Sequence, residues 1–297
     1  MQGQSPRRNI MVRAAAINPA DETSAMRQLT ALIFAAIMGT APAGAAPDAV
    51  DIDGAKLKGL IYRPAGNGPF PAVVAMHGCD GLPEPGSIIS RRYADWGERL
   101  MGAGYVVLFP DSFAARGLGA QCSAGQRSLR SGRERVVDIE AARRFLQAQS
   151  YVAADRVSLI GWANGGVATL WTVRPGAARR DGKPDFRSAV AFYPGCRRLR
   201  DTAWAARLPT LILIGDKDDW TPAGPCEQMV AGARGRTARA TIHIYPGAYH
   251  DFDHPDLPLQ QRLNVALATG PIGRVHVGTD EAARADAAKR VAEWIAR

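Results

Sequence analysis

The sequence predicts an α/β domain with a doubly wound, mostly parallel sheet. Short apolar runs recur along the chain, and each stops at or near a Gly or a Pro, which is typical of strands covered on both faces. Segments with helical spacing separate these runs, so strand and helix alternate. The chain has 297 residues, 46% of them hydrophobic, which is enough for the core that such a domain needs.

After an opening segment over residues 50–63, six apolar runs are predicted to be strands. They cover residues 71–76, 105–109, 156–160, 188–193, 210–214 and 240–245. Short, mostly apolar runs of this length fit a parallel sheet better than a sheet with one solvated face. In such sheets ligands bind beyond the carboxyl ends of the strands, so the residues directly after each run are the candidates for chemistry.

Four intervening segments are predicted to be helices: residues 91–103, 133–149, 164–173 and 279–296, the last covering the sheet as a C-terminal lid. In the second helix an apolar face holds Val136, Val137, Ile139, Ala141, Phe145 and Leu146, while Arg143, Arg144 and Gln147 lie elsewhere. Residues 175–185 and 255–278 are expected to be surface loops. No internal repeat or long linker interrupts the alternation, so residues 46–297 are predicted to form one domain.

Charge and hydropathy exclude several classes of protein. The formal charge of +9 comes from 37 Lys and Arg against 28 Asp and Glu, and the basic residues are scattered along the whole length. A scattered excess is typical of a solvated surface, so no nucleic-acid partner is expected. No stretch reaches the roughly 20 apolar residues that a spanning helix needs, so no membrane span is expected either. The oligomeric state stays open.

Residues 1–45 are predicted to be an N-terminal extension with a secretory signal peptide. A positive start at Met26-Arg27-Gln28 precedes an apolar run over 29–39 and a stretch of small residues over 41–47. This order predicts cleavage near Ala45 or Ala46 and a periplasmic or secreted protein. A buried apolar helix over 29–39 is the alternative. Export would place the cysteines in an oxidising compartment, although the sequence alone does not choose among their three pairings.

The most informative motif is Gly161-Trp-Ala-Asn-Gly-Gly166, which directly follows a predicted strand and precedes a predicted helix. It has the form of a nucleophile elbow, G-x-S-x-G, in which small residues let the chain turn sharply and raise the central side chain above the sheet. The central residue here is Ala163. Because alanine has neither hydroxyl nor thiol, this chain cannot form an acyl-enzyme at that position.

Candidates for the other members of a catalytic triad follow later strands. Asp218 follows the run 210–214 and competes with Asp216 and Asp219 for the role of the acid, with its spacing from Gly215 in its favour. His250 follows the run 240–245 and is the candidate base. Nucleophile, acid and then histidine is the chain order of the α/β-hydrolase triad.

The backbone N–H groups of two residues are candidates for an oxyanion hole. Cys79 lies after the first strong strand, and Asn164 is the first residue of the helix that follows the elbow. Four aromatic residues at strand ends are candidates for the wall of a substrate pocket, with the core as the alternative: Phe113, Trp162, Tyr193 and Trp220.

From roughly residue 50 to the C-terminus, the chain resembles the dienelactone hydrolase family of α/β-hydrolases. The motifs that carry the resemblance are His77-Gly-Cys-Asp-Gly-Leu82, Phe109-Pro-Asp-Ser-Phe113, the elbow at 161–166, Phe192-Tyr-Pro-Gly195, Gly215-x-x-Asp218 and Ala248-Tyr-His-Asp-Phe252. It implies an α/β-hydrolase fold with about seven to eight strands and helices on both faces. It also implies Asp218 as the acid, His250 as the base, and a nucleophilic Ser or Cys at position 163 in active members.

Position 163 departs from the family pattern. Ala163 is most simply explained as an engineered inactivation, and a natural pseudoenzyme is the alternative. The resemblance further implies basic residues that hold a substrate carboxylate, and Arg116 is one candidate if a one-residue insertion is allowed. Dienelactone hydrolase itself carries a Glu near the position of His77, so dienelactone is not assumed to be the substrate.

The resemblance also favours one pairing of the cysteines. In the strand order usual for the family, the loops that hold Cys79 and Cys122 follow neighbouring strands, as do those that hold Cys196 and Cys226. Two disulfides, Cys79–Cys122 and Cys196–Cys226, are therefore expected.

The predicted function is an exported serine-type hydrolase that cleaves a small-molecule carboxylic ester or lactone through a Ser(Cys)-His-Asp triad and is inactivated here by Ala163. The alternatives are a non-catalytic binding protein on a hydrolase scaffold, and a peptidase or polyester-degrading enzyme with the same triad. No cofactor is expected. No metal is expected either, because Pro255 and the lack of further ligands argue against a site at His250 and His254. His77 is expected to be a structural hydrogen-bonding residue.

Overall fold

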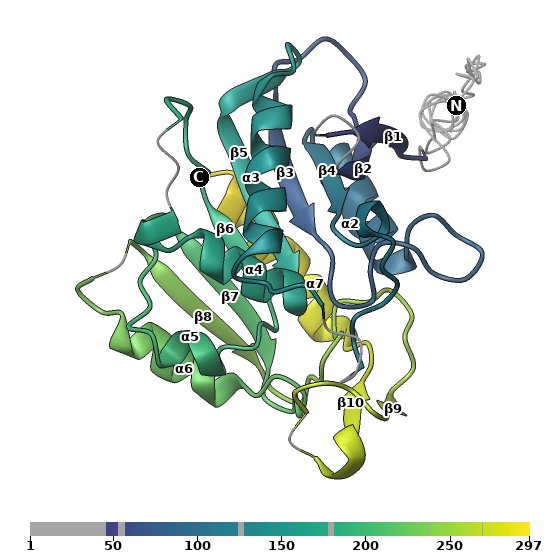
Figure 1. Cartoon of the computed structure of the whole chain (residues 1–297), viewed down its shortest axis with the longest axis vertical. Coiled ribbons are helices and arrows are strands. Elements are labelled where there is room, and N and C mark those ends of the chain that lie inside the picture. Colours follow the sequence, from purple (N-terminus) through teal and green to yellow (C-terminus); the bar gives the residue numbers. More distant parts are fainter. Residues whose placement is uncertain (1–45, 53–56, 124–127, 178–180, 237, 269) are drawn as a thin grey trace, which may run out of the picture. The chain divides into compact units, whose positions relative to one another are not determined.

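The computed structural model describes residues 46–52, 57–123, 128–177, 181–236, 238–268 and 270–297 (Figure 1). Contacts between Cα atoms divide the chain into residues 1–44 and 45–297. The predicted signal peptide therefore lies outside the described residues, which all belong to the second unit. Within the described residues, no helix combines the length and the apolar character needed to cross a bilayer.

The centre of the unit is a sheet of eight strands in the order β1-β2-β4-β3-β5-β6-β7-β8. The first two strands, β1 (Asp48–Asp51) and β2 (Lys58–Tyr62), are antiparallel to each other, and β2 is antiparallel to β4 (Val106–Asp111). All further pairings are parallel and join β3 (Phe70–Met76), β5 (Val152–Trp162), β6 (Ala189–Phe192), β7 (Thr210–Gly215) and β8 (Ala240–Tyr245). The predicted mostly parallel α/β sheet is confirmed.

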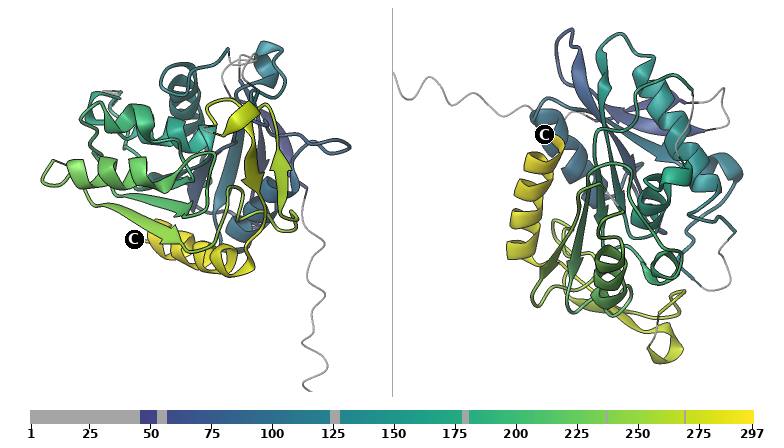
Figure 2. Two further views of the ribbon diagram at one scale, coloured as in Figure 1. Left: turned by 90° about the horizontal axis from the view of Figure 1, so that it is seen from below. Right: turned by 90° about the vertical axis from the view of Figure 1, so that its left-hand side faces the viewer.

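Helices cover both faces of the sheet. One face carries α2 (Arg91–Gly102) and α7 (Glu281–Ile295), which an ion pair of 2.8 Å joins between Asp95 and Arg284. The other face carries α3 (Glu134–Gln147) and α4 (Asn164–Thr172), as Figure 2 shows. Two further helices, α5 (Arg197–Arg200) and α6 (Ala223–Gly232), follow β6 and β7. The sequence pattern did not predict these two.

The helix α3 shows where the predicted apolar face was wrong. Val137 was placed on that face, but its side chain is 52% exposed. Arg143 was placed elsewhere, yet it is buried, because Glu140 and Asp181 accept its hydrogen bonds at 2.9 and 2.8 Å. A buried guanidinium with carboxylate partners satisfies its charge inside the protein, and an apolar periodicity does not detect such a group.

The predicted loop over residues 255–278 contains a small ribbon. Its strands β9 (Gln260–Arg262) and β10 (Val275–Val277) pair antiparallel, and the short turn η4 (Pro271–Gly273) lies between them. We call residues 255–278 the excursion. Val265, Val275 and Val277 of the excursion form a second apolar cluster with Cys79 and Trp220. The excursion therefore packs against the loops that follow β3 and β7.

Candidate active site

The turn between β5 and α4 has the backbone of a nucleophile elbow. Ala163 lies at φ 47° and ψ −111°, a backbone conformation that residues other than glycine rarely adopt. Its N–H donates to the carbonyl of Phe192 at 3.0 Å, and its own carbonyl accepts from Val167 at 2.9 Å. The strained residue is therefore fixed between a neighbouring strand and the first turn of α4.

Close packing explains the glycines of the motif. A Cβ at Gly165 would lie 2.2 Å from the carbonyl oxygen of Met76, and one at Gly161 would lie 2.4 Å from that of Gly165. No real side chain fits at either distance, so α4 can approach β3 and β5 this closely only with glycine at both positions. The residue types of the motif thus set the sharp turn, whatever side chain stands at its centre.

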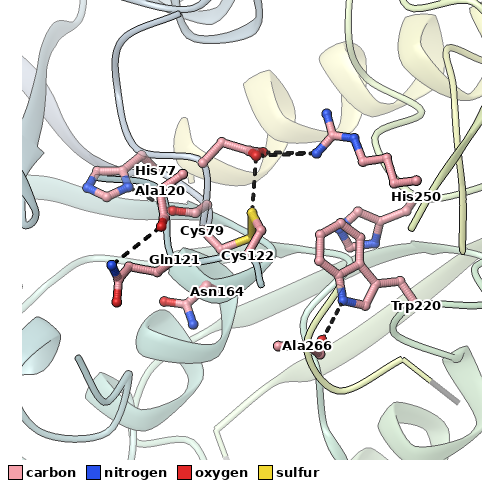
Figure 3. Close-up of a disulfide and its surroundings, with 12 residues drawn as sticks. His77, Cys79, Ala120, Gln121, Cys122, Asn164, Trp220, His250 and Ala266 are labelled. Atoms are coloured by element: carbon pink, nitrogen blue, oxygen red, sulfur yellow. Dashed lines mark hydrogen bonds and ion pairs between the residues drawn. A yellow bond between two sulfur atoms is a disulfide. The ribbon is translucent and has the colours of Figure 1, made fainter. Parts of the chain in front are cut away.

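The loop after β3 runs beside the elbow. A Cβ built at Gly78 would lie 3.6 Å from the methyl carbon of Ala163. The N–H of Gly78 donates to the hydroxyl of Tyr93 at 2.7 Å. In the described part of the chain, the N–H groups of Cys79 and Asn164 have no protein acceptor. Figure 3 draws both residues, together with His250 and Trp220, around the Cys79–Cys122 disulfide.

A buried arginine that the sequence analysis missed joins the start of α4 to the loop after β3. Arg135 is fully buried and donates one hydrogen bond to the side-chain oxygen of Asn164 and another to the carbonyl of His77, both at 2.7 Å. Burial lowers the pKa of Arg135 to about 10, which leaves the guanidinium charged at neutral pH. Its place at the start of α3 gave no signal, because charged residues are common in the first turns of surface helices.

The carboxylate of Asp218 pairs with His250. Its Oδ2 atom lies 2.7 Å from Nδ1 of the imidazole. Its Oδ1 atom accepts hydrogen bonds from the N–H groups of Trp220 and Thr221 at 3.0 and 2.7 Å. Of the three competing carboxylates, Asp216 instead accepts from Gly247 and Asp219 contacts His276.

His250 is buried and close to charge on both sides of its ring. Burial by itself would lower its pKa, but the charge and hydrogen bond of Asp218 outweigh that effect and raise the pKa above 6.5. Its Nε2 atom lies 4.0 Å from a carboxylate oxygen of Asp251. The rings of Tyr193 and Trp220 pack on the imidazole at centroid distances of 4.4 and 4.7 Å. The imidazole is therefore fixed in one orientation with Nδ1 toward the acid.

A second buried carboxylate behind the site joins three elements, and the sequence analysis missed it as well. Asp253 accepts hydrogen bonds from the indoles of Trp96 and Trp162, both at 2.7 Å, and from the hydroxyl of Tyr193 at 2.5 Å. It comes three residues after His250. The loop of the candidate base is thus tied to the elbow strand β5 and to α2.

Beside it, Asp251 forms a buried ion pair. Its carboxylate lies 2.7 Å from the guanidinium of Arg92, and both side chains are almost fully buried. Burial would raise the pKa of Asp251, but the charge of Arg92 outweighs burial and lowers the pKa to about 2. Asp251 is therefore ionised at neutral pH and holds the backbone next to His250.

The four aromatic residues predicted to line a pocket have different surroundings in the structure. Trp162 and Tyr193 are fully buried with their polar atoms bonded to Asp253, which puts them in the core instead of at a pocket wall. Phe113 packs edge-on against His77 at 4.5 Å, and Trp220 lies against His250.

Arg116 does not fit the role of an anion clamp. Its guanidinium makes two hydrogen bonds to Asp138, at 2.7 and 2.9 Å. Because this carboxylate already neutralises the charge, the structure argues against a role of Arg116 in holding a substrate carboxylate.

His77 is a buried hydrogen-bonding residue. Its Nδ1 lies 2.8 Å from the carbonyl of Gly78, which can only accept, and its Nε2 lies 3.2 Å from the N–H of Ser112, which can only donate. These partners require the neutral ring with the proton on Nδ1. Burial, together with the charge of Arg135, lowers its pKa well below 6.5, in agreement with that state.

Both predicted disulfides are present, Cys79–Cys122 and Cys196–Cys226. The first lies in the candidate site (Figure 3), where the N–H of Gln121 also donates to the carbonyl of Cys79 at 2.6 Å. Among the described residues, the one group with the spacing of metal ligands is Cys79, Asp80 and Cys122. The disulfide removes both thiolates from that group, which leaves a single carboxylate.

Two hollows lie beside the disulfide loop. One of about 60 Å³ is bordered by Asp80, Phe113 and Leu118 among others, and a more open one of about 430 Å³ runs along residues 117–121. Both lie beside the loop over residues 117–121, and the residues that border them include neither Ala163 nor His250.

Comparison with known proteins identifies the family of this chain. The model of the dienelactone hydrolase family matches residues 57–297. A relative from Bradyrhizobium sp., described as a probable 2-oxo-3-(5-oxofuran-2-ylidene)propanoate lactonase, is 26% identical over 224 residues, covering 70% of this chain and 84% of the relative.

Solved structures share the fold. A putative dienelactone hydrolase from Klebsiella pneumoniae superposes with a TM-score of 0.57 at 20% identity, covering 81% of this chain and 93% of the other. Thermogutta terrifontis esterase 2 phosphorylated by paraoxon superposes with a TM-score of 0.58 at 16% identity, covering 86% and 95%. Since the family model spans most of the chain, this protein belongs to the dienelactone hydrolase family.

Proposed function

We propose that this protein has the scaffold and binding site of a carboxylic ester or lactone hydrolase, with Ala163 in the place of its nucleophile. The observation that carries the proposal is the backbone of Ala163, at φ 47° and ψ −111° between β5 and α4. Such strain persists where the surrounding structure fixes it, and it is typical of functional sites. The buried Asp218–His250 pair, 2.7 Å apart, supplies the acid and base that an elbow nucleophile needs.

With a hydroxyl at position 163, the first half-reaction would form an acyl-enzyme. The hydroxyl oxygen attacks the carbonyl carbon of the ester while its proton passes to Nε2 of His250. Asp218 holds the imidazole through Nδ1 and stabilises its charged form. The negative charge on the carbonyl oxygen is stabilised by the N–H groups of Cys79 and Asn164, each such donor being worth roughly 3 kcal/mol of barrier.

Collapse of this intermediate breaks the bond to the alcohol oxygen, which takes the proton from His250 and leaves. In the second half-reaction a water molecule gives a proton to His250 and attacks the acyl carbon. The carboxylic acid is released, and the hydroxyl at position 163 regains its proton. Arg135 supports both steps, because it holds the side chain of Asn164 and the carbonyl of His77 beside the two oxyanion donors.

The lactonase name of the Bradyrhizobium relative favours a cyclic ester as the substrate. Ring opening releases no separate alcohol, so both product groups stay on one molecule.

Ala163 itself favours a second candidate, a non-catalytic protein that binds such esters. Loss of the nucleophile alone removes about a 10⁶-fold contribution to kcat in a serine hydrolase. The present chain is therefore expected to bind its ester without turning it over. The two candidates differ in whether a restored nucleophile is sufficient for activity.

Export to an oxidising compartment is part of the proposal. The predicted signal peptide over residues 1–45 supports it, and so do the two disulfides, since disulfides are rare in reducing compartments. Detection of a chain beginning at residue 46 or 47 outside the inner membrane would agree with this, and full-length chain in the cytoplasm would contradict it.

The decisive experiment restores the nucleophile. Ala163→Ser and Ala163→Cys are assayed with short p-nitrophenyl esters and with a small lactone, next to the parent chain. The expected result is turnover by at least one variant, a burst of p-nitrophenol, and loss of both when His250→Ala is added. If neither folded variant turns over any ester while the parent chain still binds one, the protein is a binding protein.

A further inference from the structure

The excursion exposes an unusual share of apolar side chains. Among the described residues, six large hydrophobic side chains are more than half exposed, and four of them lie in the excursion. These are Leu259, Leu263, Leu267 and Ile272, at 60%, 51%, 63% and 63% exposure. Single exposed apolar residues are ordinary, but a concentration of them on one segment marks an interaction surface.

Two of these side chains stand on strained backbone. Leu267 has φ 66° and Ile272 has φ 51°, in the left-handed region that a branched residue such as isoleucine enters only at a cost. Backbone bonds hold the segment in place: Asn264 donates to the carbonyl of Ile272 at 3.0 Å, and Ala266 donates to that of Cys122 at 2.7 Å. The two apolar side chains are thus fixed outward, although an unrestrained loop would relieve the strain.

Unpaired positive charge borders the same segment. Arg197 of α5 donates to the carbonyl of Leu267 at 3.4 Å. Arg197 and Arg274 are exposed, and neither has a carboxylate partner within the described part of the chain. Figure 1 shows the excursion as the yellow segment at the lower end of the molecule, with its short helical turn at the tip. Leu263, Leu267 and Ile272, together with Arg197 and Arg274, are called the tip surface.

We propose that the tip surface docks on an anionic lipid bilayer. Protruding apolar side chains beside arginines suit the boundary between headgroups and acyl chains. There the apolar side chains enter the apolar layer, and the arginines bind lipid phosphates. A second copy of the chain would bring the same arginines face to face across a two-fold axis, and their charges would repel. This docking is independent of the proposed ester hydrolysis, because it uses no residue of the candidate active site.

A local probe tests the proposal in the full chain, whose apolar N-terminal run could itself bind vesicles. Pro271→Cys is labelled with a polarity-sensitive dye and titrated with vesicles of phosphatidylglycerol and phosphatidylcholine, and with phosphatidylcholine vesicles alone. The dye is expected to shift to the blue with the anionic vesicles at low lipid, and to need at least tenfold more of the neutral lipid. The same dye on Ile88→Cys, a position as exposed as Ile272, is expected not to shift.

Variants in the Pro271→Cys background complete the test. Leu267→Ser is expected to raise the half-saturating lipid concentration about tenfold, and Arg197→Gln about fivefold. The matched controls Ile88→Ser and Arg63→Gln are expected to leave it unchanged, since neither residue belongs to the tip surface. Equal midpoints for tip and control variants would overturn the proposal. A dye shift that depends on protein concentration without lipid would also overturn it and would assign the surface to a second copy.

Discussion

The two sides of the candidate active site differ in which features of the proposed hydrolase they present. The elbow side, residues 161–166, has the strained backbone and the close glycine contacts of a nucleophile turn, but it presents only a methyl group. The acid–base side, residues 215–221 and 245–254, presents a paired carboxylate and imidazole. The elbow side thus has the shape of a nucleophile turn without a reactive side chain, whereas the acid–base side has the carboxylate and the imidazole in contact.

The difference separates what packing determines from what hydrogen bonding determines. The conformation of Ala163 follows from Gly161 and Gly165 against neighbouring backbone, and it does not need a nucleophile to hold it. The orientation of His250 follows from bonds to Asp218, which would be lost with that one side chain. Apart from the nucleophile position itself, substitutions on the acid–base side are therefore expected to have the larger effects on chemistry.

The largest effect is expected from Asp218→Asn in the Ala163→Ser background. An amide in place of the carboxylate no longer stabilises the charged imidazole or its tautomer, so kcat should fall about 10⁴-fold. Steady-state kinetics with a p-nitrophenyl ester measure it. Asp219→Asn is the control, because Asp219 contacts His276 and not His250. Equal losses in the two variants would place the acid elsewhere.

Asp251→Asn is expected to act on stability. It leaves the buried guanidinium of Arg92 without its partner at 2.7 Å, at a cost of about 3–5 kcal/mol in the free energy of unfolding. Urea denaturation measures this change. The exposed pair of Arg91 and Asp256 supplies the control, because Asp256→Asn should cost no more than about 1 kcal/mol.

The contribution of Asp251 to the free energy of unfolding should decrease at acid pH. Since the pKa of Asp251 is lowered from 3.8 to about 2, its stabilising contribution is complete above pH 3.8 and is lost as the pH falls toward 2. The Asp251→Asn protein should therefore lose less stability than the parent between these pH values. A parallel acid limb in both proteins would contradict the ion pair.

The two disulfides allow a matched comparison of the loop that holds the candidate oxyanion donor Cys79 with the rest of the fold. They close separations of 43 and 30 residues, so removing either by a double Cys→Ser substitution should cost a similar 2–4 kcal/mol or so. In the Ala163→Ser background, removal of Cys79–Cys122 should also lower kcat about tenfold, because it loosens an oxyanion donor. Removal of Cys196–Cys226 should leave kcat unchanged; equal effects on kcat would argue against a role of Cys79.

The smallest effect concerns the pH profile of the Ala163→Ser variant. Only neutral His250 accepts a proton, so kcat/KM should fall as the pH drops through the pKa of that imidazole. Because Asp218 raises this pKa, the limb should lie above 6.5, and Asp218→Asn should move it to lower pH. The same shift means that the pair stabilises the fold fully below pH 6.5 and less as the pH rises through the raised value. A limb below 6.5 would contradict the pairing.

Much of the fold was predictable because the strands are buried on both faces. Each predicted apolar run corresponds to a strand, with β5 longer than its run and beginning at Val152. The helix α6 escaped prediction because its sequence, with Gly224 and Pro225 in the first turn, lacks a clear apolar face. The ribbon β9–β10 escaped because its three-residue strands contain polar side chains and depend on contacts distant in sequence, such as His276 with Asp219.

The candidate site divides in the same way. Ala163, Asp218 and His250 could be singled out because each follows a strand in a motif with a known chemical order. Arg135 and Asp253 could not, since their importance comes from burial and from partners on other elements. Arg116 was misjudged for the converse reason: the sequence shows its charge, and only the fold shows that Asp138 neutralises it.

The backbone of Ala163 has a consequence for how this protein could change over generations. Every alanine codon becomes a serine codon by substitution of its first base, so a single transversion separates this chain from one with a hydroxyl on the elbow. Under the proposed function, the turn, the paired imidazole and the amides of Cys79 and Asn164 would serve that hydroxyl without a compensating change elsewhere. A genetic selection for growth on an ester as carbon source would begin one mutation away from its target.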